Sequence, residues 1–521
     1  MFYNIFHLFK IARKLGSSGA IETLDQIHKL PSILRVFFNL ISIGASKNIL
    51  SNNKRPGQNL CEALEKMGTT FIKLGQFLAT RPDIIGEELA NDLEKLQDKL
   101  PPFDINTAKN ILRKNYGEKK FKTIKSLSDP VAAASIAQVH FAVLEIENIE
   151  KEVAIKILRP EIEKLFNKEL NALLLLAFIT EKLFSKTKRL KLTEVVLLLR
   201  KITKIEMDLR FEAAAANELY SNTKNDQNIQ VPKIYWDYTS KEILTLDRVN
   251  GVSIRDIETL KKQNVDTQKL AKNLIQLFLI QAVRDGFFHG DMHQGNLFVN
   301  PKGEIVPVDF GIMGRLDKNN RKFLAEILFG FIQRDYQKVA EVHFQAGLVP
   351  NTASKDDFAQ ALRSVGEPIF GQSIKDISGG RLLAQLFEIT ERFNMQTQTQ
   401  LLLLQKTMVV VEGVARKLYP NTNIWEVSKP ILENWIKSQK DPKIKINDAI
   451  KTSGEIFKRI PELPDVMDKA NYALQMIAEG KLNIVSKNDS SYEVETLKLE
   501  KNKNKFIVYF LGIVIIILLL F

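Results

Sequence analysis

The chain has 521 residues, of which 45% are hydrophobic and 26% are charged, and only 17 are proline. This balance excludes a mainly disordered, collagen-like or coiled-coil chain. The length is sufficient for more than one hydrophobic core. The single cysteine, Cys61, excludes an intrachain disulfide and a cysteine-rich zinc module, and it fits a reducing compartment.

The net charge is +13, and much of the excess lies near the N-terminus. Residues 1–55 hold eight Lys/Arg against two acidic residues, a net charge of +6. Apolar residues recur at roughly helical spacing between Phe2 and Ile11, which predicts either an amphipathic helix on an acidic membrane surface or a basic helix docked on the core. Polar and charged residues interrupt each early apolar run, so no signal peptide is expected.

Helices are expected from residue 1 to about 125, where long periodic runs end at prolines. From 126 to 160 the pattern changes to two strands joined by a small-residue loop, a turn and a third strand. The elements expected next are a helical stretch at 161–219, short strands at 231–240 and 242–251, helices from 251 to about 480, and a polar linker at 486–505.

The last segment, 506–521, reads FIVYFLGIVIIILLLF and contains 16 uncharged residues. As a helix it would span about 24 Å at ~1.5 Å per residue, somewhat short of a ~30 Å hydrocarbon core. Four lysines stand directly before it, and nothing polar follows it. We expect a single-pass membrane anchor, with the preceding residues kept on the cytoplasmic side by the positive-inside rule.

The residues that carry chemistry are concentrated between His289 and Gly311. Asp291 and Asn296 have the D-x-x-x-x-N spacing of a kinase catalytic loop, and Asp309 opens a D-F-G after an apolar hairpin. Phosphoryl transfer needs oxygen ligands for magnesium and a separate carboxylate that orients or deprotonates the nucleophile. We therefore expect Asn296 and Asp309 to bind Mg²⁺ and Asp291 to be catalytic.

A zinc site is the alternative interpretation of this segment, because His289 and His293 lie four residues apart around Asp291. However, the acidic residue stands in the third place rather than the second, glycines disfavour a helix, and no third ligand is evident. We instead expect His289 to bond nearby backbone and to steady the loop.

Upstream, Val153 to Lys156 read V-A-I-K, the strand whose lysine neutralises the α- and β-phosphates of a nucleotide in kinases. This predicts a catalytic and nucleotide-binding role for Lys156. Its partner carboxylate should come from the following helix, which offers Glu206, Asp208 and Glu212. Asp208 and Glu212 share a helix face, and we favour Glu212 as the partner. The alternative is that these acids lie on the surface.

The phosphate loop departs from the kinase pattern. In place of G-x-G-x-x-G the chain has Ala132, Ala133, Ala134 and Ser135, whose side chains limit backbone freedom and close approach to phosphates. The nucleotide is therefore expected to bind differently. No A-P-E follows the D-F-G, so the usual activation loop and peptide-docking platform are not expected.

Taken together, these motifs resemble the UbiB family of atypical kinase-like ATPases. The resemblance spans about residues 60–320, with further similarity to about 440. Gly290 and Gln294 depart from it, because family members often carry Ala and Pro there. The segments that carry it are FIKLGQFLATRPDI, LEKLQDKLPPF, DPVAAASIAQVH, VAIKILRP, EMDLRFEAAAANEL, FFHGDMHQGN and VDFGIMGRL.

The resemblance implies an α+β fold: an atypical protein-kinase-like two-lobe fold with a helical N-terminal extension and a C-terminal transmembrane anchor. The segments expected from it are a helical extension with a K-x-G-Q motif at 1–125, a kinase-like N-lobe at 126–250, a kinase-like helical C-lobe at 251–485, a polar linker at 486–505 and a transmembrane helix at 506–521.

The resemblance also implies residue roles that spacing alone does not. The family's K-x-G-Q motif falls on Lys73 and Gln76, and its E-x-D motif falls on Glu206 and Asp208. These residues are expected to gate the site, since the K-x-G-Q helix covers the place where a kinase would dock its substrate. The alanine-rich loop Ala132–Ser135 is expected to contact the nucleotide. From spacing alone, Lys73 and Gln76 would be an exposed helical pair.

The function implied is a membrane-anchored atypical kinase or ATPase that supports aerobic ubiquinone biosynthesis, with ATP or ADP and Mg²⁺ as cofactors and little phosphorylation of proteins in trans. The expected location is the bacterial inner membrane. The expected partners are inner-membrane lipid, quinone precursors and other ubiquinone-biosynthesis enzymes, without nucleic acid. Two alternatives stay open: a nucleotide-gated scaffold for biosynthetic enzymes, and a small-molecule phosphotransferase of the aminoglycoside or choline kinase kind.

Overall fold

The computed structural model describes residues 54–79, 85–94, 100–183, 191–371 and 399–440, with some gaps and with isolated residues elsewhere. The chain divides into two compact units, 1–436 and 437–521, and every element below begins in the first unit. The expected linker and anchor, 486–521, lie outside the described residues. Among the residues that are described, no helix combines the length and the apolar character needed to cross a bilayer.

Three helices precede the sheet: α4 (Pro56–Met67), α5 (Thr69–Ala79) and α7 (Glu87–Leu93). Proline suits the first position of α4, because its φ is already helical and its missing N–H has no partner there in any case. Gly68, at φ 100°, separates α4 from α5. Gly75 allows close packing within this group, since a Cβ on it would collide with the side chains of Leu64 and Leu96.

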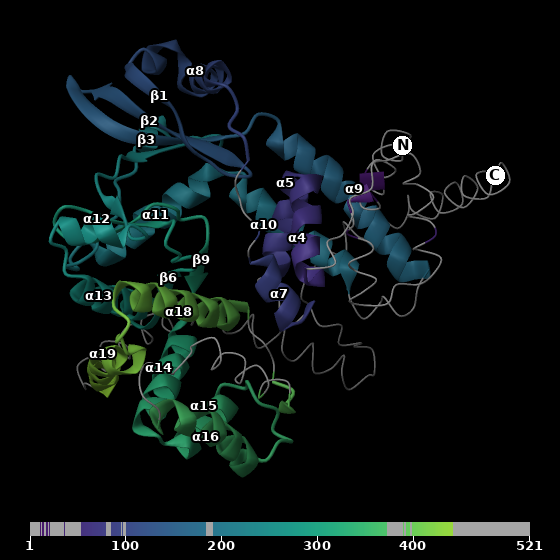
Figure 1. Cartoon of the computed structure of the whole chain (residues 1–521), viewed down its shortest axis with the longest axis vertical. Coiled ribbons are helices and arrows are strands. Elements are labelled where there is room, and N and C mark those ends of the chain that lie inside the picture. Colours follow the sequence, from purple (N-terminus) through teal and green to yellow (C-terminus); the bar gives the residue numbers. More distant parts are fainter. Residues whose placement is uncertain are drawn as a thin grey trace, which may run out of the picture. The chain divides into compact units, whose positions relative to one another are not determined.

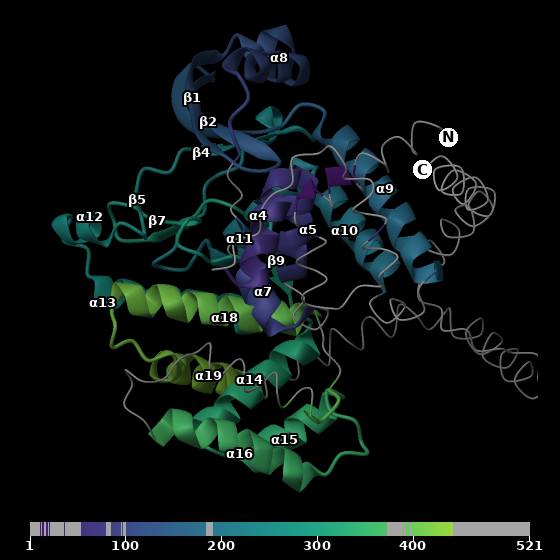
Figure 2. The ribbon, with the colours of Figure 1, turned by 45° about the vertical axis from the view of Figure 1, so that its right-hand side comes forward.

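A four-stranded antiparallel sheet has the order β1-β2-β3-β4. Figure 1 labels its first three strands, and Figure 2 labels β4. Its strands are β1 (Ile124–Ala133), β2 (Ala137–Ile146), β3 (Ile149–Leu158) and β4 (Ile243–Asp247). The three strands expected between 126 and 160 are therefore present. Glu147 and Asn148 form the two-residue turn between β2 and β3, both with the positive φ that a tight hairpin requires. Helix α8 (Ile105–Phe121) packs its buried residues Ala108 and Leu112 into the core of this sheet.

Three helices follow β3: α9 (Ile162–Leu183), α10 (Leu192–Glu206) and α11 (Leu209–Thr223). The break between α10 and α11 falls at Asp208, whose carboxylate accepts a hydrogen bond from the backbone N–H of Arg210 (3.2 Å) and so caps α11. Helix α11 contacts β4. This contact brings Glu212, in the first turn of α11, next to the sheet.

The strand expected at 231–240 is wrong. This stretch makes only an isolated bridge at Ile234 and a short 3-10 turn that ends at Tyr238. The carbonyl of Tyr238 accepts hydrogen bonds from the hydroxyls of Tyr116 (3.0 Å) and Thr245 (2.6 Å), both from neighbouring elements. These side-chain bonds satisfy the Tyr238 carbonyl, while the N–H of Tyr235 and the carbonyl of Lys233 bond the backbone of β4 on either side of the bridge.

The rest of the described chain is mainly helical, as expected, but short strands interrupt it. The helices are α12 (Ile257–Lys262), α13 (Thr267–Leu279), a π-helical turn (Ile280–Asp285), α14 (Lys318–Gln333), α15 (Tyr336–Gln345), α16 (Lys355–Gly371), α18 (Thr399–Leu418) and α19 (Ile424–Lys440). The strands are β5 (Val252–Ser253), β6 (Phe287–His289), β7 (Leu297–Val299), β8 (Ile305–Pro307) and β9 (Met313–Arg315). Helix α18 packs along α13, as both views show (Figures 1 and 2).

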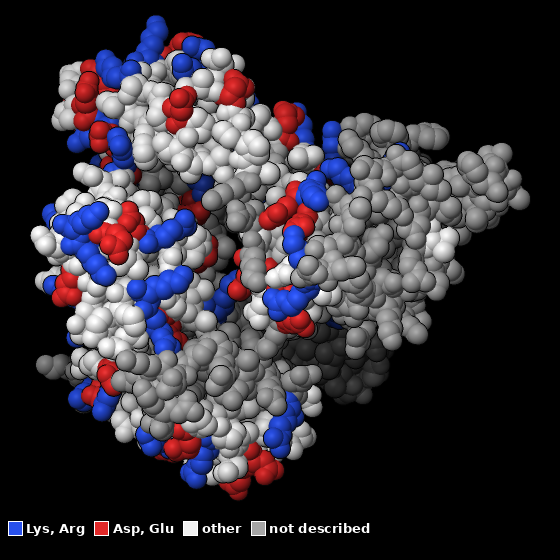
Figure 3. Space-filling model, viewed as in Figure 1, with Lys and Arg blue, Asp and Glu red and all other residues white. Residues whose placement is uncertain are grey.

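Charges of both signs are interspersed over the described surface on the side drawn in Figure 3. Several basic side chains there and elsewhere are held in ion pairs, such as Arg284 with Asp226 (2.7 Å) and Lys241 with Glu163 (2.6 Å). On this described face, therefore, the positive excess of the chain does not form one continuous basic patch.

Candidate functional site

The candidate site is built on two pairs of short strands. Strand β6 pairs with β9, and β7 pairs with β8. The β7–β8 hairpin ends with the N–H of Val308 donating to the carbonyl of Asn296 (3.0 Å). Asn296 therefore lies across the ladder from the residue that precedes Asp309. Asp291, the first residue of the D-x-x-x-x-N motif, follows β6 by two positions.

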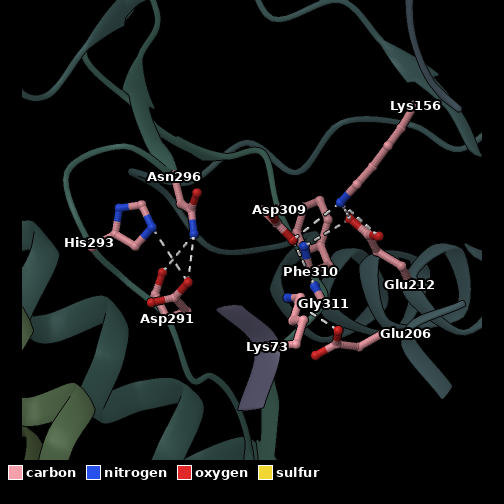
Figure 4. Close-up of polar contacts among 10 residues, drawn as sticks. All are labelled: Lys73, Lys156, Glu206, Glu212, Asp291, His293, Asn296, Asp309, Phe310 and Gly311. Carbon is pink, nitrogen blue, oxygen red and sulfur yellow. Dashed lines mark hydrogen bonds and ion pairs between the residues drawn. The ribbon is translucent and has the colours of Figure 1, made fainter. Parts of the chain in front are cut away.

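Hydrogen bonds fix the loop that carries Asp291. The side-chain nitrogen Nδ2 of Asn296 donates to the backbone carbonyl and to Oδ2 of Asp291, both at 3.1 Å (Figure 4). Nδ1 of the buried His289 accepts a hydrogen bond from the N–H of Asp291 (3.1 Å), which is the backbone role expected for this histidine. Burial lowers the pKa of His289 and keeps its ring neutral. On the open side, Nε2 of His293 lies 3.5 Å from Oδ2 of Asp291.

Lys156 connects strand β3 to the D-F-G segment. Its Nζ lies 2.8 Å and 3.0 Å from the two carboxylate oxygens of Glu212 and 3.6 Å from Oδ1 of Asp309 (Figure 4). Glu212 also accepts a hydrogen bond from the N–H of Phe310 (3.4 Å). Of the three acids considered from the sequence, Glu212 is thus the one that pairs with Lys156. The pair joins the sheet, helix α11 and the D-F-G segment.

The three charged groups differ in burial. The side chains of Lys156 and Glu212 are 15% and 8% exposed, whereas that of Asp309 is 44% exposed. Burial by itself would lower the pKa of Lys156, but the carboxylates of Asp309 and Glu212 raise it above its ordinary value. Burial raises the pKa of Glu212, a shift that the Lys156 charge opposes.

The pKa of Asp309 is shifted in the opposite direction from that of Glu212. Burial would raise its pKa, but Lys156, the N–H of Gly311 (3.0 Å from Oδ1) and more distant charges hold that pKa well below its usual range. Asp309 is therefore an ionised carboxylate that water can reach. These are the properties expected of a ligand for a hard cation.

Two residues of the expected gate also meet at this site. Nζ of Lys73, on α5, lies 3.2 Å from Oε2 of Glu206, at the end of α10, and both side chains are more than four-fifths buried. Figure 4 shows Lys73 beside the D-F-G segment, and its charge contributes to the lowered pKa of Asp309. The pair of exposed residues suggested by spacing alone is thus wrong for Lys73. Asp208 caps α11 instead, and Gln76 is half-buried on α5.

The alanine-rich loop is a tight turn rather than an open loop. Ala132 and Ala133 end β1, and the N–H of Ala134 donates to the carbonyl of Ala137 (2.8 Å) at the start of β2. Ser135 is fully buried. None of the residues from Ala132 to Ser135 adopts a positive φ, so the turn does not use the conformations that glycine provides in a kinase loop.

Helix α18 makes contacts with the catalytic loop that the sequence did not reveal. Oγ1 of the buried Thr407 lies within hydrogen-bond distance of two carbonyls, that of Leu403 in its own helix (2.7 Å) and that of Gly290 (3.0 Å), directly before Asp291. A Cβ at position 290 would lie 3.1 Å from the side chain of Leu403, one turn earlier, so α18 packs closely on this loop. Lys406 forms an ion pair with Glu94 at the end of α7 (3.2 Å). No local pattern could predict a contact between residues 117 positions apart.

The donors present fit magnesium. Hard cations prefer oxygen ligands, and Mg²⁺ usually keeps several waters and is held by few protein groups together with substrate phosphates. The carboxylate of Asp309 and the amide oxygen of Asn296 supply such ligands from the two ends of one hairpin. In the part of the chain that the structure describes, no group of three or more His, Cys, Asp or Glu side chains could hold a metal by itself.

Known proteins match most of the chain. The family description "ABC1 atypical kinase-like domain" matches residues 95–343, and "UbiB helical domain" matches residues 362–423. A protein of Marinobacter nauticus named "Probable protein kinase UbiB" is 39% identical over 466 residues, 88% of this chain and 84% of that protein.

Other relatives agree in name. The Histophilus somni protein of the same name is 35% identical over 98% of this chain and 93% of its own length, and that of Pseudomonas aeruginosa is 40% identical over 74% and 73%. A solved Mycobacterium tuberculosis complex of Rv3197 with erythromycin is 23% identical, with a TM-score of 0.45, over 70% of this chain and 93% of that one. The fold is kinase-like, with mixed helices and strands.

Proposed function

Because this chain belongs to the UbiB family of ABC1 atypical kinase-like proteins, we propose that it is a membrane-anchored, Mg²⁺-nucleotide-dependent ATPase that supports aerobic ubiquinone biosynthesis. ATP or ADP is its nucleotide, and it phosphorylates proteins in trans little or not at all. The observation that carries the proposal is the buried pair Lys156–Glu212 held against Asp309.

In this proposal each residue has one task. Lys156, oriented by Glu212, binds the α- and β-phosphates. Asp309 and the amide oxygen of Asn296 hold Mg²⁺, which neutralises charge on the phosphates when it is bound. Asp291, positioned by the Asn296 amide nitrogen, orients the attacking water or hydroxyl and accepts its proton.

The segment after D-F-G supports a substrate other than a folded protein. Strand β9 begins at Met313, only two residues after Gly311, and pairs back onto β6. Helix α14 begins at Lys318, capped by Asp317. This spacing has no room for an extended activation segment, the platform on which protein kinases dock peptides. Helix α5, through Lys73, occupies the adjoining space.

The location at the membrane rests on the apolar segment 506–521. Truncation after Lys505 should convert binding that resists high salt and alkaline washing into binding that salt removes, because only the basic N-terminal region would then attract anionic lipid, and salt screens that attraction. The measurement is fractionation of cells that express the full chain or the truncated chain. Recovery of the full chain as freely soluble protein would contradict the anchor.

The decisive test of the function combines two measurements. Cells that lack the gene and grow with oxygen should contain little ubiquinone, and the wild-type chain should restore it, whereas Asp291→Asn should not. The purified protein in anionic liposomes should hydrolyse ATP steadily, and Asp291→Asn should lower that rate by at least ~10²-fold, as expected for loss of a catalytic base.

The alternatives predict different outcomes of the same experiments. Full restoration of ubiquinone by Asp291→Asn would favour a nucleotide-gated scaffold. ATP turnover that requires an added aminoglycoside or choline, with normal ubiquinone in the deletion strain, would favour a small-molecule phosphotransferase.

A further inference from the structure

Arg159, the residue that follows β3, engages the carbonyls of the alanine-rich turn. Its backbone N–H donates to the carbonyl of Ile136 (2.8 Å), and its Nε donates to the carbonyl of Ala134 (3.0 Å). Two carbonyl oxygens of the turn therefore face Arg159. A carbonyl oxygen that faced a nucleotide phosphate would repel it, so the direction in which these groups point matters for any phosphate next to the turn.

The same guanidinium holds a second segment. Nη1 of Arg159 donates to the carbonyl of Pro101 (2.9 Å), and Nη2 donates to that of Leu100 (3.4 Å). These residues connect the N-terminal helices, which carry Lys73, to α8. One side chain thus bonds both the alanine-rich turn and the connector of the helical extension.

Gln138, at the start of β2, bonds the backbone of the same connector at Phe103. The N–H of Phe103 donates to its Oε1 (2.9 Å), and its Nε2 donates to the carbonyl of Phe103 (3.1 Å). Nε2 also lies 2.8 Å from Nε2 of His140, whose Nδ1 lies 2.8 Å from the carbonyl of Ser128. That carbonyl can only accept, so Nδ1 of His140 carries the proton, and Nε2 accepts from Gln138. This series of hydrogen bonds, from Gln138 through His140 to the carbonyl of Ser128, fixes the orientation of the buried Gln138 amide.

We propose that Arg159 is a positioning residue that couples the alanine-rich turn to the connector at residues 100–103, so that the direction in which the turn's carbonyls point relative to a nucleotide phosphate depends on where this connector is held. Because ATP carries one more phosphate than ADP, a carbonyl released toward the nucleotide should change the two affinities unequally. The proposal rests on the proposed nucleotide function. Its structural half, the coupling of two segments by one guanidinium, is independent of that function. The guanidinium of arginine spreads five N–H donors over three nitrogens and so spans both segments at once, whereas lysine carries its three donors on a single nitrogen.

The test uses the full chain with Arg159→Lys, which keeps the charge, and Arg159→Ala. The control is Arg248→Lys, an arginine of the same sheet that pairs with Glu152 (3.4 Å) and stacks on Phe141. In the nucleotide-free protein, amide hydrogen exchange at Phe103 and at Ala134 should become at least tenfold faster in both Arg159 variants and stay unchanged in the control. Faster exchange in only one of the two segments, or in neither, overturns the coupling.

Titration with ATP and with ADP tests the functional half. The ratio of the two affinities should shift about fivefold in Arg159→Lys and stay within twofold in Arg248→Lys. A purely structural role would lower both affinities alike, so an unchanged ratio counts against positioning. If the wild type binds neither nucleotide, the proposed function fails, and the exchange measurement still decides whether Arg159 couples the two segments.

Discussion

Asp309→Asn should abolish Mg²⁺-dependent nucleotide binding. Mg²⁺ is held by few protein ligands, so the loss of its ionised carboxylate leaves the cation poorly compensated. We expect Mg-ATP affinity to fall at least 100-fold, about 2.8 kcal/mol at ~1.4 kcal/mol per decade. Binding of metal-free ATP should persist or increase slightly, because one negative charge near the phosphates is gone.

The measurement is titration of ATP into each protein with Mg²⁺ and again with a chelator. Asp317→Asn is the matched control, since Asp317 only caps α14, and asparagine is an equally good cap. Its Mg-ATP affinity should equal that of the wild type. Unchanged Mg-ATP affinity in Asp309→Asn would show that Asp309 is not a ligand of Mg²⁺, even if the kinase-like fold is correct.

The sequence predicted the parts of this site that depend on local pattern. The V-A-I-K strand, the D-x-x-x-x-N loop and the apolar hairpin before D-F-G each have a period or spacing that forces a local structure, and the structure contains all three. The pairing of Lys156 with Glu212 could also be predicted across 56 residues. A buried lysine needs a carboxylate partner, and the following helices offered only a few candidates.

Contacts that depend on packing between distant elements could not be predicted. The hydroxyl of Thr407 bonds the carbonyl of Leu403, as threonines in helices often do, and only the packing of α18 also brings it within 3.0 Å of the carbonyl of Gly290. Arg159 stands before a proline at the end of a strand, where an arginine is usually solvated. The place of Lys73 was expected from the family resemblance and not from helical spacing, which predicts an exposed side chain.

The incorrect strand at 231–240 has a related cause. Its β-branched and aromatic residues are typical of a strand, but β-propensity measures how well side chains fit a pleated surface more than any backbone preference. In the fold, the Tyr238 carbonyl accepts hydrogen bonds from the hydroxyls of Tyr116 and Thr245, which belong to elements before and after it in the chain. Tertiary hydrogen bonds thus overrode the local pattern.

Lys156→Met should abolish nucleotide-dependent hydrolysis and make the free energy of unfolding decrease between pH 5 and pH 8, where Asp309 contributes no such slope in the wild type. In the wild type the folded pKa of Asp309 lies below its unfolded value, so this group contributes stability above the unfolded pKa, and the contribution is lost as pH falls. Without the lysine, the carboxylates of Asp309 and Glu212 face each other with no cation between them. The pair then retains a proton at higher pH, and the pKa of the pair rises above the unfolded values.

The sign of the stability change follows from this shift. In the variant the folded state binds more protons than the unfolded state, so its free energy of unfolding decreases as pH rises from 5 to 8. Removal of one partner from a buried ion pair typically costs about 3–5 kcal/mol. We expect a cost near the lower end of that range at pH 8 and a smaller cost at pH 5, because one proton then relieves the repulsion. The slope reaches ~1.4 kcal/mol per pH unit at most, and only where the pair takes up that proton.

Urea unfolding of both proteins between pH 5 and pH 8 measures this difference. Lys151→Met is the matched control, because Lys151 lies exposed on the same strand, and its loss should leave both hydrolysis and the pH profile unchanged. A Lys156→Met protein with the pH profile of the wild type would show that water, and not Lys156, compensates the two carboxylates. Hydrolysis retained in that variant would make Lys156 a purely structural partner of Glu212. Another cation near the site would then have to bind the phosphates. Lys73 would be the candidate, because its charge already lowers the pKa of Asp309.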